Sequence, residues 1–538
     1  LVGLAWLVWL AAGGWALWFR GPETARPRPV PAGDQEIVWL FPSTSGDAWS
    51  LFVIGLKRCE MPVNGVPSGI TVDDSAAFPE QSTAVPELVV ERAGYAGQLR
   101  IRWYKIGGGA TIAAWVEALA KRRPAPLAVI GGSTSDRAQE LATALNRQAI
   151  WRGQRPIFVI TTATVDTVLA DPDNPDVYAR VTDQRNLADV YPGRTFRFCF
   201  SNSQMVRAVT DFVLQDATLH PGPQGLPSVR AVGAAAGGVW PALAALPDAA
   251  RPPTVFPLEW QDDPYSGDLY NQFREYLFEA LGGPAAPPRV HRVPTFSVPF
   301  SVGAFSRPNP GEAAAIRDIL ARLPPDTNER SLLVLPTGSS APARRILLAL
   351  AERVPGSGRR LVALTGDGMS VNTFYRDAEW AWPARSIPIP MVLFAHANPV
   401  GWDDPTDTTP PPGYRLEPKT TTEEVFLDHT IGRTLIAAAF APVPPGQPAR
   451  LLGAADEVAA HLRVRSDKFF DDKGNRRSLG GEHVVVVRPT LRYGDTHLGR
   501  PRPDATIDVY RREDDGVSWK RAGSVLVQPP GRTKGAPE

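Results

Sequence analysis

The stretch Pro126–Thr164, PLAVIGGSTSDRAQELATALNRQAIWRGQRPIFVITTAT, decides the fold. An apolar run at Leu127–Ile130 predicts a buried strand, Asp136–Asn146 has helical spacing of apolar residues, and Ile157–Ile160 predicts a second strand. Small hydroxyl residues follow both strands. Ligands bind outside the carboxyl ends of the strands of an open α/β sheet, where helix N-termini present free N–H groups. The stretch therefore predicts one side of a small-molecule binding site.

The same alternation of strands and helices continues along most of the chain. Repeated strand–helix units predict doubly wound parallel sheets, and their number predicts two lobes rather than one. The further strands expected lie at Leu99–Trp103, Val229–Val232, Thr254–Leu258, Ser331–Leu335 and Leu361–Leu364, and the further helices at Ile112–Lys121, Met205–Leu214, Trp240–Leu246, Ser266–Leu281 and Ala341–Val354.

Composition excludes several classes of function. The 538 residues include 57 basic and 56 acidic side chains, so the net charge of +1 does not favour a nucleic-acid partner. The seven histidines are scattered and no pair has the spacing of a zinc-binding helix, and no Gly-x-Ser-x-Gly motif is present. We therefore expect that the protein binds no metal or cofactor and is not an enzyme. The two cysteines, Cys59 and Cys199, form either one bridge or two buried thiols.

The N-terminal segment predicts an attachment to a membrane. Residues 1–19, LVGLAWLVWLAAGGWALWF, carry no charge, and a helix of this length would span about 28 Å, close to the hydrocarbon thickness of a bilayer. A cleaved signal peptide is the alternative, but no small-residue cleavage site follows. The proline-rich residues 20–35 predict a stiff linker, and the soluble part is expected in the periplasm or outside the cell, anchored to the inner membrane.

Four groups of residues carry a family resemblance. They are Val129-Ile130-Gly131 with Thr134-Ser135, Thr162-Ala163-Thr164, Asp262-Asp263-Pro264-Tyr265-Ser266-Gly267 and Gly366-Asp367-Gly368. In this order and spacing, over roughly residues 70–488, they resemble the landmarks of type I periplasmic-binding proteins, the superfamily of the branched-chain amino acid binding proteins and related receptor ligand-binding regions.

The resemblance implies a fold, a function and a set of site residues. The fold would be two doubly wound lobes joined by a multi-strand hinge, which close on a small polar ligand such as an amino acid. The first lobe would bind the ligand carboxylate through Thr134, Ser135, Ala163 and Thr164, and the second would offer the Tyr265 ring and hydroxyl and the Asp367 carboxylate for an ammonium group. A transporter permease or a sensor subunit would be the protein partner. The alternative is an interaction module that has kept the fold and lost the ligand.

The resemblance also implies the order of the segments. The expected parts are an anchor at 1–19, the linker at 20–35, lobe 1 over 36–204 and again over 386–450, lobe 2 over 205–385 and again over 451–521, and a disordered tail at 522–538.

Each expected site residue also has a purely structural interpretation. Thr134 and Ser135 are good helix caps, Asp367 between glycines suits a turn, and Tyr265 suits a packed loop aromatic. The adjacent Asp262 and Asp263 are more typical of a solvated turn than of a metal site. Similarly, residues 107–109, GGG, predict a tight turn because the P-loop ending is absent.

Overall fold

A computed structural model describes most of the chain. The described residues are 25–62, 65–107, 110–169, 184–223, 253–258, 264–282, 289–290, 310–326, 328–338, 340–369, 371, 387–400, 422–441, 449–465, 469–477, 480–489, 496–497, 500–501 and 505–527. The predicted anchor at 1–19, the expected strand at Val229–Val232, the expected helix at Trp240–Leu246 and the pair Asp262-Asp263 lie outside them. Within these ranges, no helix combines the length and the hydropathy that a membrane span needs.

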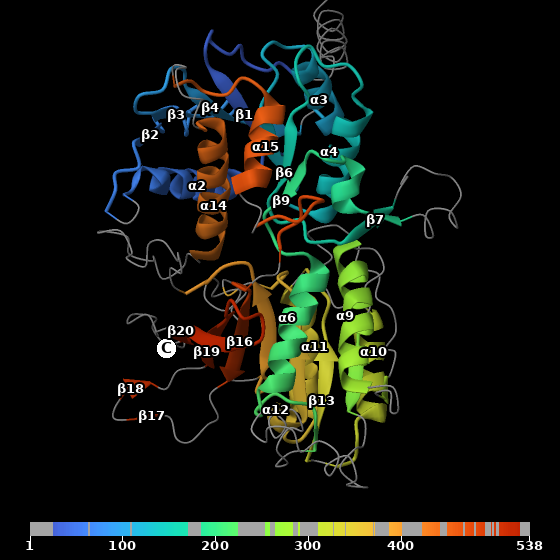
Figure 1. The fold of residues 1–538 in the computed structure, drawn as a ribbon. Coiled ribbons are helices and arrows are strands. Elements are labelled where there is room, and N and C mark those ends of the chain that lie inside the picture. Colours follow the sequence, from blue (N-terminus) through green and yellow to red (C-terminus); the bar gives the residue numbers. More distant parts are fainter. Residues whose placement is uncertain are drawn as a thin grey trace, which may run out of the picture. The chain divides into compact units, whose positions relative to one another are not determined.

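The chain divides into two compact units (Figure 1). Unit 1 comprises Leu1–Ala163, Ala170–Phe198 and Asp428–Arg476, and unit 2 comprises Thr164–Leu169, Cys199–Leu427 and Arg477–Glu538. Apart from the short excursion at Thr164–Leu169, the chain passes between the units after Phe198, after Leu427 and after Arg476.

Unit 1 is built on a seven-stranded sheet in the order β2-β3-β4-β1-β5-β6-β9. Its elements are β1 (Gln35–Pro42), α2 (Gly46–Lys57), the 3₁₀ turn Arg58–Glu60, β2 (Ile70–Asp73), β3 (Glu87–Arg92), β4 (Leu99–Ile106), α3 (Ile112–Ala120), β5 (Ala128–Gly131), α4 (Ser135–Arg147), β6 (Ile157–Ile160), β8 (Gln184–Asn186), the 3₁₀ turn Leu187–Val190, β9 (Thr195–Arg197), most of α14 (Thr422–Ala439) and α15 (Ala455–Arg465). Strands β1, β4, β5, β6 and β9 are parallel, whereas β2 and β3 run antiparallel at one edge.

Unit 2 is built on a larger sheet whose main path is β12-β11-β13-β14-β15-β16-β19-β20. Its elements are β7 (Thr167–Leu169), α6 (Asn202–Gln215), β10 (Gly222–Pro223), β11 (Thr254–Pro257), α9 (Pro264–Gly282), β12 (Arg289–Val290), α10 (Pro310–Arg322), β13 (Glu329–Val334), α11 (Ser340–Arg353), α12 (Ser357–Arg360), β14 (Leu361–Leu364), β15 (Met391–Ala395), β16 (His483–Pro489), β17 (Thr496–His497), β18 (Arg500–Pro501), β19 (Ala505–Arg512) and β20 (Trp519–Val527).

Alternate residues of the unit 2 strands enter two different cores. Val362 and Leu364 of β14 pack with α6 and α9, whereas Leu361 and Ala363 pack with α10 and α11. A strand buried on both faces has no polar alternation, which explains its unbroken apolar sequence. Unit 2 is therefore a three-layer α/β/α structure (Figure 1).

The α/β fold with parallel strands agrees with the sequence prediction, but three expectations are wrong. The sheets are mixed rather than wholly parallel, because β2 and β3 in unit 1 and β16, β19 and β20 in unit 2 are antiparallel. The sequence also assigns Met391–Ala395 to lobe 1 and Ala455–Val464 to lobe 2. In the structure β15 is the parallel neighbour of β14 in unit 2, and α15 belongs to unit 1. Finally, β20 extends the ordered sheet to Val527, into the segment predicted to be a disordered tail.

Candidate functional site

The carboxyl edge of the unit 2 sheet gathers several polar side chains. Strands β14 and β15 are parallel neighbours, so the residues that follow them lie at the same edge. Asp367 comes three residues after β14, His396 comes directly after β15, and Tyr265 begins α9 after β11. We call Tyr265, Asp367 and His396 the unit 2 cluster.

Asp367 is the acceptor at the centre of this cluster. The Tyr265 hydroxyl donates to its Oδ1 at 2.8 Å, and His396 Nε2 lies 2.9 Å from its Oδ2. The Asp367 side chain retains 15% exposure, whereas that of His396 retains 5%. Tyr265 Oη in turn accepts the backbone N–H of Gly368 at 3.0 Å. Thus both carboxylate oxygens are already hydrogen-bonded, while a carboxylate can accept about four such bonds.

The tautomer of His396 follows from its second partner. The backbone N–H of Phe200 donates to His396 Nδ1 at 3.2 Å, so that nitrogen must be the unprotonated acceptor. Nε2 then carries the proton and donates to Asp367. The imidazole also stacks on the Phe200 ring and meets Phe394 edge-on, which fixes its orientation. His396 therefore donates to Asp367 through its Nε2–H group.

A buried carboxyl group supports the backbone of the histidine. Glu423, at the start of α14, accepts the His396 backbone N–H at 2.6 Å. Burial raises the pKa of Glu423 to about 8, and the charges of Glu424 and Asp367 push it in the same direction. Burial thus favours the neutral form of Glu423 compared with an exposed glutamate.

The glycine at position 366 makes room for this arrangement. A Cβ atom there would lie 2.6 Å from Tyr265 Oη and 2.9 Å from Leu269 Cδ2, closer than van der Waals contact permits. Gly368 has the same property, because a Cβ atom would lie 2.6 Å from the backbone oxygen of Thr337. The Gly-x-Gly turn therefore lets the chain pass close to α9 and to the loop after β13.

The resemblance assigns Thr164 to the first lobe, but in the structure it belongs to unit 2. It is 1% exposed, and its carbonyl accepts the backbone N–H of Asn202 at the start of α6 at 2.7 Å. The Asn202 amide donates to Asp268 of α9 at 2.8 Å and to the carbonyl of Tyr265 at 3.4 Å. Thr164 is thereby connected to the unit 2 cluster through Asn202.

The other three expected residues lie in unit 1, at the carboxyl ends of β5 and β6. Thr134 is exposed and is the N-cap of α4, yet its side chain makes no capping hydrogen bond. Ser135 and Ala163 are buried. The two corners are tied together because the Thr162 hydroxyl donates to the carbonyl of Ser133 at 3.0 Å. Thr134 therefore occupies the N-cap position, as the structural interpretation expects, but without a capping hydrogen bond from its side chain.

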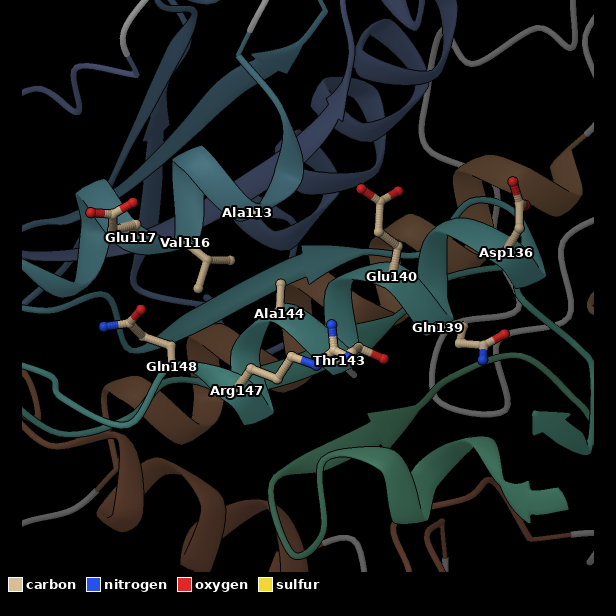
Figure 2. Close-up of a pocket in the computed structure, with 10 residues that line it drawn as sticks. All are labelled: Ala113, Val116, Glu117, Asp136, Gln139, Glu140, Thr143, Ala144, Arg147 and Gln148. Atoms are coloured by element: carbon tan, nitrogen blue, oxygen red, sulfur yellow. The ribbon is translucent and has the colours of Figure 1, made fainter. Parts of the chain in front are cut away.

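A groove of about 550 Å³ lies elsewhere on unit 1, along α3 and α4 (Figure 2). Its lining includes the acidic residues Glu117, Asp136 and Glu140, and Figure 2 shows Arg147 and Gln148 at the end of α4 opposite to Asp136. Its lining includes none of the six expected site residues, so it does not correspond to the predicted site.

Two further features of the described ranges bear on metal binding and on the reactivity of the cysteines. Within these ranges, no group of three or more His, Cys, Asp or Glu side chains is arranged to hold a metal ion. Cys59 and Cys199 are buried free thiols, which resolves the alternative left open by the sequence. Burial raises the pKa of Cys59 to about 12, so it is a poor nucleophile.

Sequence reasoning missed His396 and Glu423. His396 directly follows a buried strand that neighbours the strand before Asp367, and this position was the available signal. Glu423 gave no comparable signal, because only the tertiary structure buries it.

Comparison with known proteins gives structural likenesses only. No protein-family model matches the sequence, and no curated protein matches it significantly. An ABC transporter substrate-binding protein from Desulfitobacterium hafniense is similar with a TM-score of 0.43 and 13% identity, covering 86% of this chain and 98% of that one. A solute-binding protein from R. palustris in complex with benzoate gives a TM-score of 0.40 and 11% identity, over 93% and 98% of the two chains.

A third solved structure is the leucine-, isoleucine-, valine-, threonine- and alanine-binding protein from Brucella ovis in its closed conformation. It gives a TM-score of 0.47 and 11% identity, over 92% of this chain and 96% of that one. All three TM-scores are below 0.5, so the fold assignment rests on the strand order of the two sheets. By their descriptions, these three solved structures are a substrate-binding, a solute-binding and an amino-acid-binding protein.

Proposed function

We propose that this chain is a membrane-anchored, extracytoplasmic solute-binding protein whose unit 2 cluster binds the amine of a small polar ligand, such as an amino acid. The observation that carries the proposal is that Tyr265 and His396 both orient one partly exposed carboxylate, Asp367, at the carboxyl edge of a parallel sheet. The ligand would serve a transporter permease or a sensor subunit.

Charge and hydrogen-bonding capacity support an amine as the group bound. Tyr265 and His396 both donate to Asp367, so its carboxylate is the acceptor that the cluster would offer to a cationic group. Among the described residues, these two are the donors to Asp367, and a carboxylate can accept about four hydrogen bonds, which suits an ammonium group with three donors. In the proposed mechanism the hydroxyl corners at Thr134, Ser135, Ala163 and Thr164 take the ligand carboxylate, and the ligand stabilises a closed state by its higher affinity for that state.

One observation favours the alternative, an interaction module without a ligand. The hydrogen bonds around Asp367 form a closed set within the protein, so the carboxylate has a structural role even without any ligand. The two functions differ in one measurable property, because only a binding protein gains stability from a small molecule.

A thermal-shift screen of the full chain against amino acids, amides, sugars and aromatic acids tests the proposal. A ligand at 100 times its dissociation constant adds about 2.7 kcal/mol to the free energy of unfolding. Small-angle X-ray scattering with and without that ligand tests closure. No shift with any compound would exclude the binding function and leave the interaction module.

The role of Asp367 is tested with Asp367→Asn, which keeps the size of the side chain. Loss of a charged hydrogen bond of about 1.5–3 kcal/mol predicts a 10- to 150-fold weaker affinity for an amine ligand. Asp508→Asn is a matched control, since Asp508 is also in unit 2, is 10% exposed and accepts from Arg488 and Arg521. Unchanged amine affinity in Asp367→Asn would refute the role of this carboxylate.

A further inference from the structure

The amino edge of the unit 1 sheet carries a group of features that ligand binding does not use. The loops that lead into parallel strands share one edge, because the amino ends of these strands meet there. The loops that lead into β1, β5 and β6 comprise residues 25–34, 121–127 and 148–156. Together these three loops form what we call the amino edge of unit 1.

The loop before β6 presents an apolar tip. Ile150 is 78% exposed, one of the highest values among the large apolar side chains of the described residues. Trp151 beside it is half-buried, with its indole N–H donating to the carbonyl of Gln148 at 3.1 Å. Arg152 follows and is exposed. A single exposed isoleucine is ordinary, but an aliphatic side chain, a tryptophan and an arginine in succession are typical of a membrane–water interface.

Basic side chains surround this tip. Arg123 and Arg152 both line a hollow of about 330 Å³ at the amino edge. Neither arginine forms a salt bridge with any residue that the structure describes. Asp456, whose backbone N–H donates to Gln154 in the same loop, has its carboxylate paired with Arg194. The hollow is therefore an electropositive place with two arginines available to an anion.

The chain arrives at this same edge from the apolar N-terminal segment. Arg28 donates its backbone N–H to the Tyr104 hydroxyl at 3.0 Å, and its carbonyl accepts from Arg102 at 3.2 Å and from Arg122 at 2.7 Å. Residue 28, within the segment predicted as a stiff linker, is thus fixed on unit 1. The nine residue steps from Phe19 to Arg28 span at most about 30 Å, so an anchor ending at Phe19 would hold the amino edge within that distance of a bilayer.

We propose that the amino edge of unit 1 is a membrane-contact surface that lies against anionic phospholipid headgroups. Ile150 and Trp151 enter the interface, and Arg123 and Arg152 pair with lipid phosphates. Charge complementarity and the short, docked linker both favour a lipid surface as the occupant. This inference rests on the proposed N-terminal anchor and is independent of the proposed ligand.

A fluorescent label reports the contact in the full chain reconstituted into vesicles. Ile150→Cys carries an environment-sensitive maleimide, and Phe78→Cys is the matched control because Phe78 is 58% exposed in the loop before β3, at the opposite edge of the same sheet. The native thiols are both buried, so they do not compete for the label. In phosphatidylglycerol vesicles we expect a blue shift and quenching by a lipid-borne quencher at position 150 and neither at position 78.

Charge dependence distinguishes a lipid contact from a chance apolar encounter. The signal at position 150 should be lost in phosphatidylcholine vesicles, at 1 M salt, where the screening length falls to about 3 Å, and in the double variant Arg123→Glu/Arg152→Glu. The double variant Arg353→Glu/Arg359→Glu, on exposed arginines of unit 2, should leave the signal unchanged. Equal signals at positions 150 and 78, or no dependence on lipid charge, would overturn the proposal. Alkaline extraction of the vesicles tests the anchor separately, and the thermal-shift screen tests the ligand.

Discussion

Replacing Gly366 by alanine should displace Tyr265 from the unit 2 cluster. The added Cβ atom would lie 2.6 Å from Tyr265 Oη and 2.9 Å from Leu269 Cδ2, and Leu269 is fully buried in the core below α9. The tyrosine ring is rigid, so its hydroxyl must move and its bonds to Asp367 and Gly368 must lengthen or break. Overpacking costs about 1–3 kcal/mol, and a weakened charged hydrogen bond adds to it, so we expect a total loss of about 2–4 kcal/mol.

Urea unfolding followed by fluorescence and by circular dichroism measures this loss, and ligand affinity is measured on the same samples. Gly267→Ala is the control, because Gly267 lies in α9 two residues after Tyr265 and a Cβ atom there meets no atom within 4 Å. That variant should be more stable by about 0.5–1 kcal/mol, since alanine favours a helix. If Gly366→Ala unfolds at the same urea concentration as the wild type, the close approach of Tyr265 to this backbone is wrong.

Two further predictions concern buried carboxyl groups. Glu36→Gln in unit 1 should cost about 3–5 kcal/mol by chemical unfolding, because fully buried Glu36 faces the buried Arg102 and the partly exposed Arg122, whereas exposed Glu117→Gln should change little. Equal effects of the two variants would contradict this prediction. Glu423 has its pKa raised from 4.5 to about 8, so the wild type should lose stability as the pH rises from about 4.5 to about 8 and then level off. Thermal melts of Glu423→Gln over that range should show a smaller loss, and an identical slope would count against the burial of this group.

The fold class could be predicted because local patterns dominate it. The strand predicted at Ile157–Ile160 is β6 with the same bounds, and the helix predicted at Asp136–Asn146 is α4. The membership of Met391–Ala395 could not be predicted in the same way. Its five residues are all buried, and a continuous apolar run carries no signal of the sheet or the neighbour that it will join. Sheet membership is decided by long-range pairing.

The candidate site could be predicted only in part for a similar reason. Asp367 and Tyr265 stand in recognisable turns, and their mutual hydrogen bond brings them together as the resemblance implies. The sequence could have indicated His396 as a site residue, because it directly follows a predicted strand. The burial of Glu423 arises where the start of α14 covers the backbone after β15, and no pattern within α14 encodes that contact.

The hydrogen bonds of the unit 2 cluster also determine which donor and acceptor groups a ligand would contact there. The tautomer with its proton on Nδ1 would leave the backbone N–H of Phe200 without its acceptor, and a buried unpaired donor costs about 1–3 kcal/mol. The backbone therefore favours the tautomer with its proton on Nε2, which donates to Asp367 Oδ2. Because Tyr265 donates to Oδ1 of the same carboxylate, a ligand amine would share Asp367 with two protein donors that hold the carboxylate in one orientation.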